Sequence, residues 1–195
     1  MKFVSIPTRH FPSAWAMLLC GLLAWLPGFA AATPDARTPS WATPLNRTFN
    51  LYRMSPSLYR SALPARANLP QLEKLGVRTV ISFIEDSDAP WLGDSRVQRV
   101  NIPLHADRVD DADVIEVLRA VQRAQANGPV LIHCKSGADR TGLAAGLWLL
   151  LQGRSPEEAM AQLSLRWGHI SASRTGILDA FFRLYAKAAP KPFLD

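Results

Sequence analysis

A cysteine and an arginine six positions apart, Cys134 and Arg140, are the residues of this sequence best suited to covalent chemistry on an anion. A cysteine thiolate is a strong nucleophile, and the planar guanidinium of arginine can hold two oxygens of one phosphate group. Gly137 lies between them and lets the backbone turn closely around a ligand. A short apolar run, Val130 to His133, precedes the cysteine, and an apolar helical segment, Thr141 to Leu151, follows the arginine. A strand, a tight loop and a helix start favour a bound phosphate, with Cys134 as its attacker.

The predicted phosphate loop binds its ligand mainly through backbone N–H groups. It comprises Lys135, Ser136, Gly137, Ala138, Asp139 and Arg140. We expect the hydroxyl group of Thr141 to hydrogen-bond the thiolate and help it leave, although this residue could instead cap the helix. We expect His133 to orient the loop through its ring N–H rather than to act as a base. The negative charge of Asp139 argues against very highly charged substrates.

The cysteine content supports a reactive thiol. The sequence has two cysteines, and Cys20 lies in a segment that we predict to be removed, which leaves Cys134 without an internal disulfide partner. The alternative is a buried cysteine that acts as a small hydrophobic residue. The neighbouring Gly137 and Arg140 favour the reactive thiol.

The N-terminal segment has the pattern of a secretory signal peptide. Lys2 and Arg9 precede an apolar run from Ala14 to Leu26, and small residues follow at Ala30 and Ala32. The run is shorter than the roughly 20 apolar residues of a membrane-spanning helix. We therefore predict a signal peptide over residues 1–32, cleavage after Ala32, and a periplasmic or secreted protein with no stable membrane insertion.

The rest of the chain predicts one domain. Residues 33–50 are rich in proline and predict an N-terminal arm, and residues 51–190 predict the catalytic domain. The expected strands are 58–60, 77–84, 97–102 and 130–133, and the expected helices are 69–75, 112–126, 141–151, one starting at Ser155, and 175–188. Because strands and helices alternate, we predict an α/β sandwich with a mainly parallel central sheet flanked by helices.

The charge favours an anionic ligand. The formal net charge is +6, falling by the two charges of Lys2 and Arg9 when the leader is removed. The sequence has no block of basic residues and no stacking motif, so we expect no nucleic-acid partner. We expect no metal and no other cofactor, and we expect a monomer.

The ten residues from His133 to Gly142 read His-Cys-Lys-Ser-Gly-Ala-Asp-Arg-Thr-Gly. This run resembles the signature of the protein tyrosine phosphatase superfamily, His-Cys-x-x-Gly-x-x-Arg-Thr-Gly. Its place late in a short chain is similar to that in dual-specificity phosphatases, and Leu58 to Pro64 resembles the first strand of small bacterial and fungal-plant members. With the export signal, the chain is similar to the periplasmic dual-specificity tyrosine phosphatases of bacteria. The resemblance covers residues 58–185.

The resemblance implies a two-step reaction through a cysteinyl-phosphate intermediate, in which one carboxyl group acts first as an acid and then as a base. Family members keep an aspartate on a loop some thirty residues before the cysteine. Asp107 is our choice, and Asp110 and Asp111 are rivals that lie nearer a helix start, where capping is the ordinary role of aspartate. We expect a shallow pocket that takes phosphotyrosine, and also phosphoserine or phosphothreonine, in an exported protein or in the periplasmic domain of a membrane protein. The alternatives are an inositol-phosphate or phospholipid-headgroup phosphatase, which Lys135 would suit, and a catalytically silent phosphate-binding module.

Several other polar or aromatic residues receive structural interpretations. We expect Asp86 and Asp88 to lie in a solvated loop rather than to bind a metal. We expect the side chain of Arg60 to have a structural role, tying its strand to the sheet, rather than to contact the substrate. We expect Trp148 to lie in the core.

Overall fold

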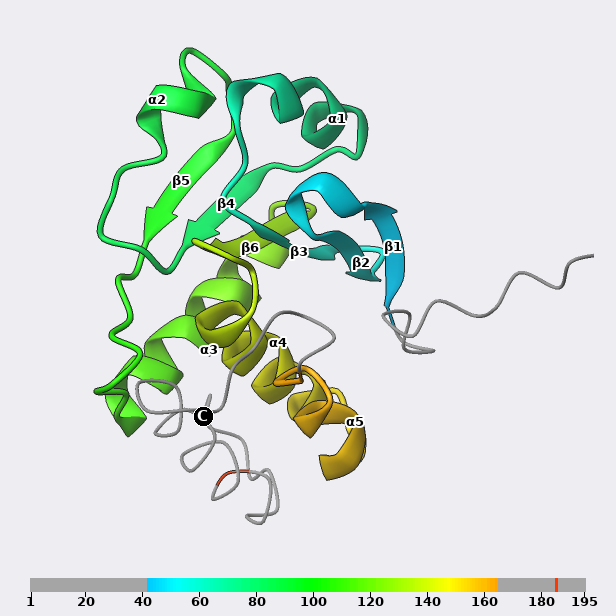
Figure 1. Cartoon of the computed structure of the whole chain (residues 1–195), viewed down its shortest axis with the longest axis vertical. Coiled ribbons are helices and arrows are strands. Elements are labelled where there is room, and N and C mark those ends of the chain that lie inside the picture. Colours follow the sequence, from blue (N-terminus) through cyan, green and yellow to red (C-terminus); the bar gives the residue numbers. More distant parts are fainter. Residues whose placement is uncertain (1–41, 165–184, 186–195) are drawn as a thin grey trace, which may run out of the picture. The chain divides into compact units, whose positions relative to one another are not determined.

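The computed structural model describes residues 42–164 and Tyr185 (Figure 1). The chain divides into two compact units, Met1–Pro34 and Asp35–Asp195, and all described residues belong to the second. The predicted signal peptide 1–32, residues 33–41 of the predicted arm and, apart from Tyr185, the predicted helix 175–188 lie outside the described residues. Within the described part, no helix is long and apolar enough to cross a membrane.

A six-stranded mixed sheet forms the centre of the fold. Its strands are β1 (Thr43–Asn46), β2 (Leu51–Ser55), β3 (Leu58–Ala62), β4 (Thr79–Ser82), β5 (Gln98–Asn101) and β6 (Val130–Cys134), in the order β1-β2-β3-β6-β4-β5. The strands β3, β6, β4 and β5 run parallel, and β1 and β2 add an antiparallel edge. The carboxyl ends of the four parallel strands therefore meet at one edge, where open α/β sheets bind their ligands.

The sheet begins earlier in the sequence than the predicted domain. Thr43 pairs with Arg53, so the last residues of the predicted arm 33–50 form a strand and a short 3₁₀ helix, Arg47–Phe49. The strand β1 is an edge strand with exposed and half-buried side chains, and Pro44 lies at a position that an edge strand tolerates. Such a strand carries no alternation of apolar and polar residues, which explains why the pattern did not predict it.

Helices cover both faces of the sheet, as Figure 1 shows. They are α1 (Leu69–Lys74), α2 (Ala89–Leu92), α3 (Asp111–Gln125), α4 (Asp139–Leu151) and α5 (Pro156–Met160), with a second 3₁₀ helix at Arg66–Asn68. The helix α4 is apolar on nearly every side because it is buried between the sheet and its neighbours α3 and α5. The helix α5 begins with the predicted cap, since Ser155 accepts a hydrogen bond from the backbone N–H of Glu158.

Two apolar cores lie on the two faces of the sheet. In β6, Ile132 and Cys134 belong to the core that contains α3, α4 and Trp148, whereas Leu131 belongs to the core with α1 and α2. This alternation follows from the period of a strand, whose successive side chains point to opposite faces. The predicted α/β fold with a sheet flanked by helices is confirmed. The predicted position of Trp148 in the core is also confirmed, because its side chain is buried.

Candidate active site

A cleft of about 480 Å³ lies at the carboxyl edge of the parallel strands. Segments that follow four different strands contribute to it. Its lining residues are Leu63 after β3, Ile84, Glu85 and Asp86 after β4, Leu104, His105, Ala106 and Asp107 after β5, and Lys135 and Arg140 after β6. The fold thus brings the predicted phosphate loop and the predicted acid Asp107 to one cleft.

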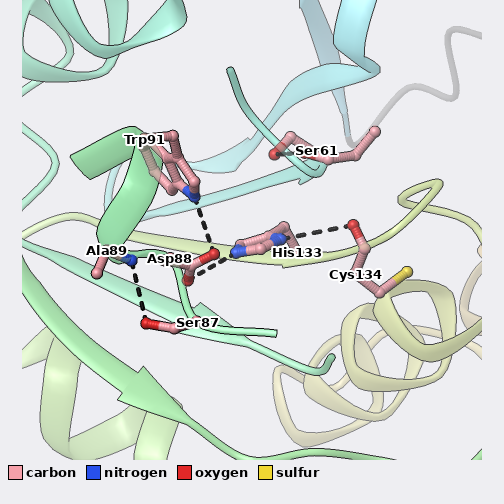
Figure 2. A network of polar contacts seen from close by, with 8 residues as sticks. Ser61, Ser87, Asp88, Ala89, Trp91, His133 and Cys134 are labelled. Carbon is pink, nitrogen blue, oxygen red and sulfur yellow. Dashed lines mark hydrogen bonds and ion pairs between the residues drawn. The ribbon is translucent and has the colours of Figure 1, made fainter. Parts of the chain in front are cut away.

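Cys134 is the last residue of β6 and lies at the base of the phosphate loop. Its side chain is only 1% exposed, and it is a free thiol. It does not line the cleft itself, since Lys135 is the first residue of the loop to reach the cleft. Figure 2 shows its sulfur atom beyond the end of the strand, beside the start of a helix. Cys134 thus combines burial with a position directly before the loop.

The phosphate loop is held from outside through three successive carbonyl groups. The carbonyl of Lys135 accepts a 3.2 Å hydrogen bond from the backbone N–H of Leu63. The carbonyl of Ser136 accepts one of 3.1 Å from Asn50 Nδ2, and that of Gly137 accepts one of 2.6 Å from Arg60 Nη2.

These bonds determine where the backbone N–H groups of the loop point. In a trans peptide the N–H of the next residue points away from the carbonyl, and the described residues contain no cis peptide. The N–H groups of Ser136, Gly137 and Ala138 therefore point to the inner side of the loop. They find no hydrogen-bond partner among the described residues. Successive unpaired N–H groups of this kind form a site for an anion.

Gly137 is required at its position for two reasons. Its φ of 73° lies in the left-handed region, which side chains rarely adopt. A Cβ atom at this position would also lie 2.6 Å from the backbone nitrogen of Ala62 and from the backbone carbonyl of Ser61. The loop therefore packs directly on the end of β3, and only glycine allows that contact.

Arg140 extends from the first turn of α4 into the cleft. Its Nη1 donates hydrogen bonds to the carbonyl oxygens of Phe83, at 3.1 Å, and Leu104, at 3.3 Å. These two bonds fix the plane of the guanidinium and leave Nε and Nη2 without a partner among the described residues. The free edge can hold two oxygens of one phosphate group.

Arg60 has a structural role, as expected, but its side chain ties β3 to the phosphate loop and to the segment after α5 rather than to the sheet. It is fully buried, and its guanidinium binds the Gly137 carbonyl and the side-chain oxygen of Gln162. Burial lowers the pKa of Arg60 to about 10, although its electrostatic interactions with Cys134 and Tyr52 oppose this effect. Arg60 therefore stays protonated at neutral pH and adds a positive charge behind the loop.

Thr141 does not cap α4, because the helix begins two residues earlier, at Asp139. The residue at the cap position of α4 is Ala138, which makes no side-chain cap bond. The hydroxyl oxygen of Thr141 is buried and has no hydrogen-bond partner among the described residues. A buried hydroxyl beside the loop is free to donate to a thiolate, which is the role predicted for it.

The structure distinguishes the three candidate acids. Asp107 is exposed and lines the cleft. Asp110 accepts a 3.0 Å hydrogen bond from the backbone N–H of Asp113 and caps α3. Asp111 accepts a hydrogen bond from the hydroxyl of Tyr185. Of the three, only Asp107 lines the cleft.

The expectation that Asp86 and Asp88 share a solvated loop is wrong for Asp88. Asp86 is exposed, but Asp88 is only 5% exposed. One carboxylate oxygen of Asp88 accepts a 2.9 Å hydrogen bond from Trp91 Nε1, and the other lies 3.1 Å from His133 Nε2 (Figure 2). Burial alone would raise the pKa of the Asp88 carboxyl, but its interactions with His133, Trp91 and Arg99 hold the pKa below its ordinary value.

Two residues of the loop's support were missed by the sequence interpretation. Asn50 adopts a left-handed backbone with φ of 51°, which asparagine tolerates better than most residues. An asparagine between two predicted segments signals such a turn, but nothing in the sequence says that its side chain reaches Ser136. Asp88 precedes Ala89 and Pro90, a pattern that signals a helix start and would have argued against a solvated loop.

Residues 54–177 match a family model described as "Swiss Army Knife protein, DSP-PTPase phosphatase domain". The chain belongs to this phosphatase family. It is 48% identical over 158 residues to the dual specificity protein phosphatase TpbA of Pseudomonas aeruginosa strain UCBPP-PA14, covering 78% of this chain and 72% of that protein. A crystal structure of a cysteine-to-serine variant of P. aeruginosa TpbA in complex with pTyr aligns with a TM-score of 0.67 and 42% identity, covering 77% of this chain and 98% of that chain. The inositol diphosphatase DSP1 of Oryza sativa subsp. japonica is 33% identical over 119 residues, covering 53% of this chain and 50% of that protein.

Family membership makes this chain a cysteine-dependent phosphatase of the dual-specificity type. The membership of the protein tyrosine phosphatase superfamily that the ten residues from His133 to Gly142 indicated is therefore confirmed. The described residues contain no group of three or more histidine, cysteine, aspartate or glutamate side chains placed to hold a metal ion. The site of this DSP-PTPase domain thus offers a thiol, a guanidinium fork, inward N–H groups and a carboxyl group around one cleft.

Proposed function

We propose that this protein hydrolyses phosphotyrosine in proteins, and also phosphoserine or phosphothreonine, through a phosphate ester of Cys134. The observation that carries the proposal is the loop in which three successive carbonyl groups, those of Lys135, Ser136 and Gly137, are held from outside, so that the N–H groups that follow them point inward. The similarity to TpbA, a dual specificity protein phosphatase with a pTyr complex, supports phosphotyrosine as the leading substrate.

In the first step, the thiolate of Cys134 forms a bond to phosphorus while the bond between phosphorus and the tyrosine oxygen breaks. Asp107 donates a proton to the departing oxygen. Arg140 and the N–H groups of Ser136 to Ala138 hold the phosphate oxygens, and they bind more strongly as charge builds up in the transition state.

In the second step, water attacks phosphorus and the sulfur–phosphorus bond breaks. Asp107, now a carboxylate, takes a proton from the water, and inorganic phosphate is released. Thr141 donates a hydrogen bond to the departing thiolate, which lowers the barrier to this step. The positive charge comes from Arg140 and the amides, so the reaction needs no metal.

The test is phosphate release from a phosphotyrosine peptide by residues 33–195 with EDTA present. The wild type should release phosphate, whereas the Cys134→Ser variant should bind the peptide without turnover. Equal release by the two proteins would show that another group is the nucleophile. Loss of activity with EDTA would contradict metal-independent chemistry.

Hydrolysis of inositol phosphates is the second candidate function. The similarity to the rice inositol diphosphatase and the presence of Lys135 in the cleft favour it. Glu85 and Asp86 line the same cleft and oppose a polyanionic substrate. A higher kcat/KM for inositol hexakisphosphate than for a phosphotyrosine peptide would establish this alternative. A silent binding module is disfavoured because the nucleophile, the arginine and a candidate acid are all in place.

We also propose that the chain is exported to the periplasm, acts there on an exported protein or a periplasmic domain, and works as a monomer. The basic and apolar pattern of residues 1–32 supports export. Mass spectrometry of the mature protein should find Thr33 at its N-terminus, and light scattering should give the mass of one chain. An uncleaved product in the cytoplasm would refute export, and a dimer mass would refute the monomer.

A further inference from the structure

A buried pair of side chains, Asp88 and His133, lies next to the nucleophile on the other face of the sheet (Figure 2). The side chain of His133 is fully buried and that of Asp88 is 4% exposed. His133 Nε2 lies 3.1 Å from one oxygen of the carboxylate, while Trp91 Nε1 donates to the other at 2.9 Å. Both carboxylate oxygens therefore have a hydrogen-bond partner although the side chain is almost fully buried.

The second ring nitrogen of His133 faces the backbone of the nucleophile. Nδ1 lies 3.5 Å from the carbonyl oxygen of Cys134, a long hydrogen bond. The partners of both ring nitrogens are thus oxygens that can only accept: a carboxylate and a carbonyl. A neutral imidazole has a single N–H and would leave one nitrogen lone pair facing an oxygen. Only the doubly protonated ring can donate to both.

Asp88 supplies the charge that makes such a ring tolerable in the interior. A buried imidazolium without a counter-ion would be strongly destabilised. The low pKa of the Asp88 carboxyl keeps it negative at neutral pH. Trp91 also packs against the His133 ring, with the two ring planes at 78°, so it contacts both members of the pair.

Asp88 is not simply the cap of the helix that it precedes. It lies at the cap position of α2, yet its side chain makes no cap hydrogen bond there. Its carboxylate turns instead toward Trp91 and His133.

We propose that Asp88 is a positioning residue of the phosphatase reaction: it holds His133 as a doubly protonated ring and, through that ring, the peptide between Cys134 and Lys135. Because this peptide is trans, holding the Cys134 carbonyl directs the Lys135 N–H to the opposite side. The carbonyls of Lys135, Ser136 and Gly137 are held in the same manner from outside. The pair thus completes a series of four restrained peptides that begins at the nucleophile.

The decisive variant is Asp88→Asn, which keeps the size of the side chain and an oxygen that can accept from Nε2–H but removes the charge. Without its counter-ion His133 becomes neutral and keeps a single ring N–H, so it can no longer donate both to the side chain at position 88 and to the Cys134 carbonyl. We expect kcat/KM for p-nitrophenyl phosphate to fall on the order of 10-fold to 100-fold, the size of effect that a small misplacement of a catalytic group produces. The matched control is Asp94→Asn, the same substitution at an exposed residue after α2.

Two measurements separate positioning from a loss of folding. The ¹⁵N spectrum of the His133 ring should show two protonated nitrogens in the wild type and in Asp94→Asn, and one in Asp88→Asn. Titration with inorganic phosphate should shift the Lys135 amide resonance in the wild type, and the Asp88→Asn variant should bind phosphate at least several-fold more weakly. Neither measurement requires phosphotyrosine turnover, so they remain valid if the proposed substrate is wrong.

The wild-type spectrum alone can overturn the proposal, even if the variant fails to fold. A neutral His133 ring in the wild type at pH 7 would refute it. It would also be refuted if Asp88→Asn matched the wild type in kcat/KM and phosphate affinity, or if Asp94→Asn lost as much activity as Asp88→Asn.

Discussion

Arg60 Nη2 donates a 2.6 Å hydrogen bond to the carbonyl oxygen of Gly137, a residue 77 positions further along the chain. Nη1 of the same guanidinium binds the side chain of Gln162, so one buried arginine joins β3, the phosphate loop and the segment after α5. Lysine has a single charged point and cannot hold two partners in this planar arrangement.

The Arg60→Lys variant should therefore lose activity although it keeps the charge. We expect kcat/KM for phosphotyrosine peptide to fall about 10-fold or more, because the Gly137 peptide is no longer held. The matched control is Arg53→Lys in β2, where the exposed guanidinium lies over the ring of Tyr59 and does not contact the loop. If both variants kept wild-type kcat/KM, the restraint by Arg60 would have no catalytic role.

Gly137→Ala and Gly153→Ala form a second matched pair. Both glycines have positive φ, 73° and 75°, but an added Cβ would meet backbone atoms at 2.6 Å in the first case and nothing within 4 Å in the second. The strained φ should cost each variant about 1–2 kcal/mol in free energy of unfolding. The clash should cost Gly137→Ala about 1–3 kcal/mol more and remove most of its activity. Urea unfolding and phosphate release measure the two effects, and equal behaviour of the variants would contradict the close contact with β3.

Substitution of Asp107 should lower activity, whereas substitution of Asp110 should lower the stability of the fold. Asp107→Asn should reduce kcat for phosphotyrosine about 100-fold or more because the leaving oxygen needs a proton. It should affect p-nitrophenyl phosphate much less, since that leaving group departs without help. Asp110→Ala should leave kcat unchanged and lower the free energy of unfolding by about 0.5–2 kcal/mol through loss of the cap. The reverse pattern would make Asp110 the acid.

Two acidic residues that line the cleft beside the proposed acid, Glu85 and Asp86, should set the choice between substrates. Replacing both, as Glu85→Gln with Asp86→Asn, removes repulsion of polyanions from the cleft. We expect the ratio of kcat/KM for inositol hexakisphosphate to that for phosphotyrosine peptide to rise several-fold at low salt and less at high salt. The control is Glu116→Gln with Asp94→Asn, which makes the same change in net charge at exposed positions outside the cleft. An equal rise in the control would indicate a general charge effect.

The lowered pKa of Asp88 predicts a dependence of stability on pH. A carboxyl whose pKa is lower in the folded state binds its proton more weakly there than in the unfolded chain, where the pKa is about 3.9. Its stabilising contribution is therefore complete above that value and is lost as the pH falls through the folded pKa. The difference in Tm between the wild type and Asp88→Asn should be largest near pH 6 and shrink below about pH 4. A difference that stays constant from pH 6 to pH 3 would argue against a charged pair.

The parts of the site that were predictable from sequence are those made by adjacent residues. The strand before Cys134, the turn at Gly137 and the helix after Arg140 each depend on short-range patterns, and the structure has all three. The position of Asp107 in the cleft was predicted from the family resemblance, and it agrees with the rule that a loop after a parallel strand reaches the carboxyl edge of the sheet.

The support of the loop could not be predicted, because it depends on pairs far apart in the chain. Asn50 and Ser136 are separated by 86 positions, and His133 and Asp88 by 45. Nothing local distinguishes Asn50 from any asparagine in a turn, and the helix start after Asp88 does not indicate that its side chain reaches His133. Only the register of β3, β4 and β6 brings them to the loop.

Because residues far away in the chain hold the carbonyl groups of the phosphate loop, a catalytically competent site forms late in folding. Three of the loop's carbonyl groups are held by Asn50, Arg60 and Leu63, which lie in or next to β2 and β3, whereas the nucleophile lies far along the chain. Closing such long loops is slow compared with forming a helix or a turn. In a chain in which β6 and α4 have formed but β3 has not yet docked, Cys134 is present but the phosphate loop is not yet held in the form that binds a phosphate group. The rate at which phosphatase activity recovers should therefore report the rate of the last step of refolding.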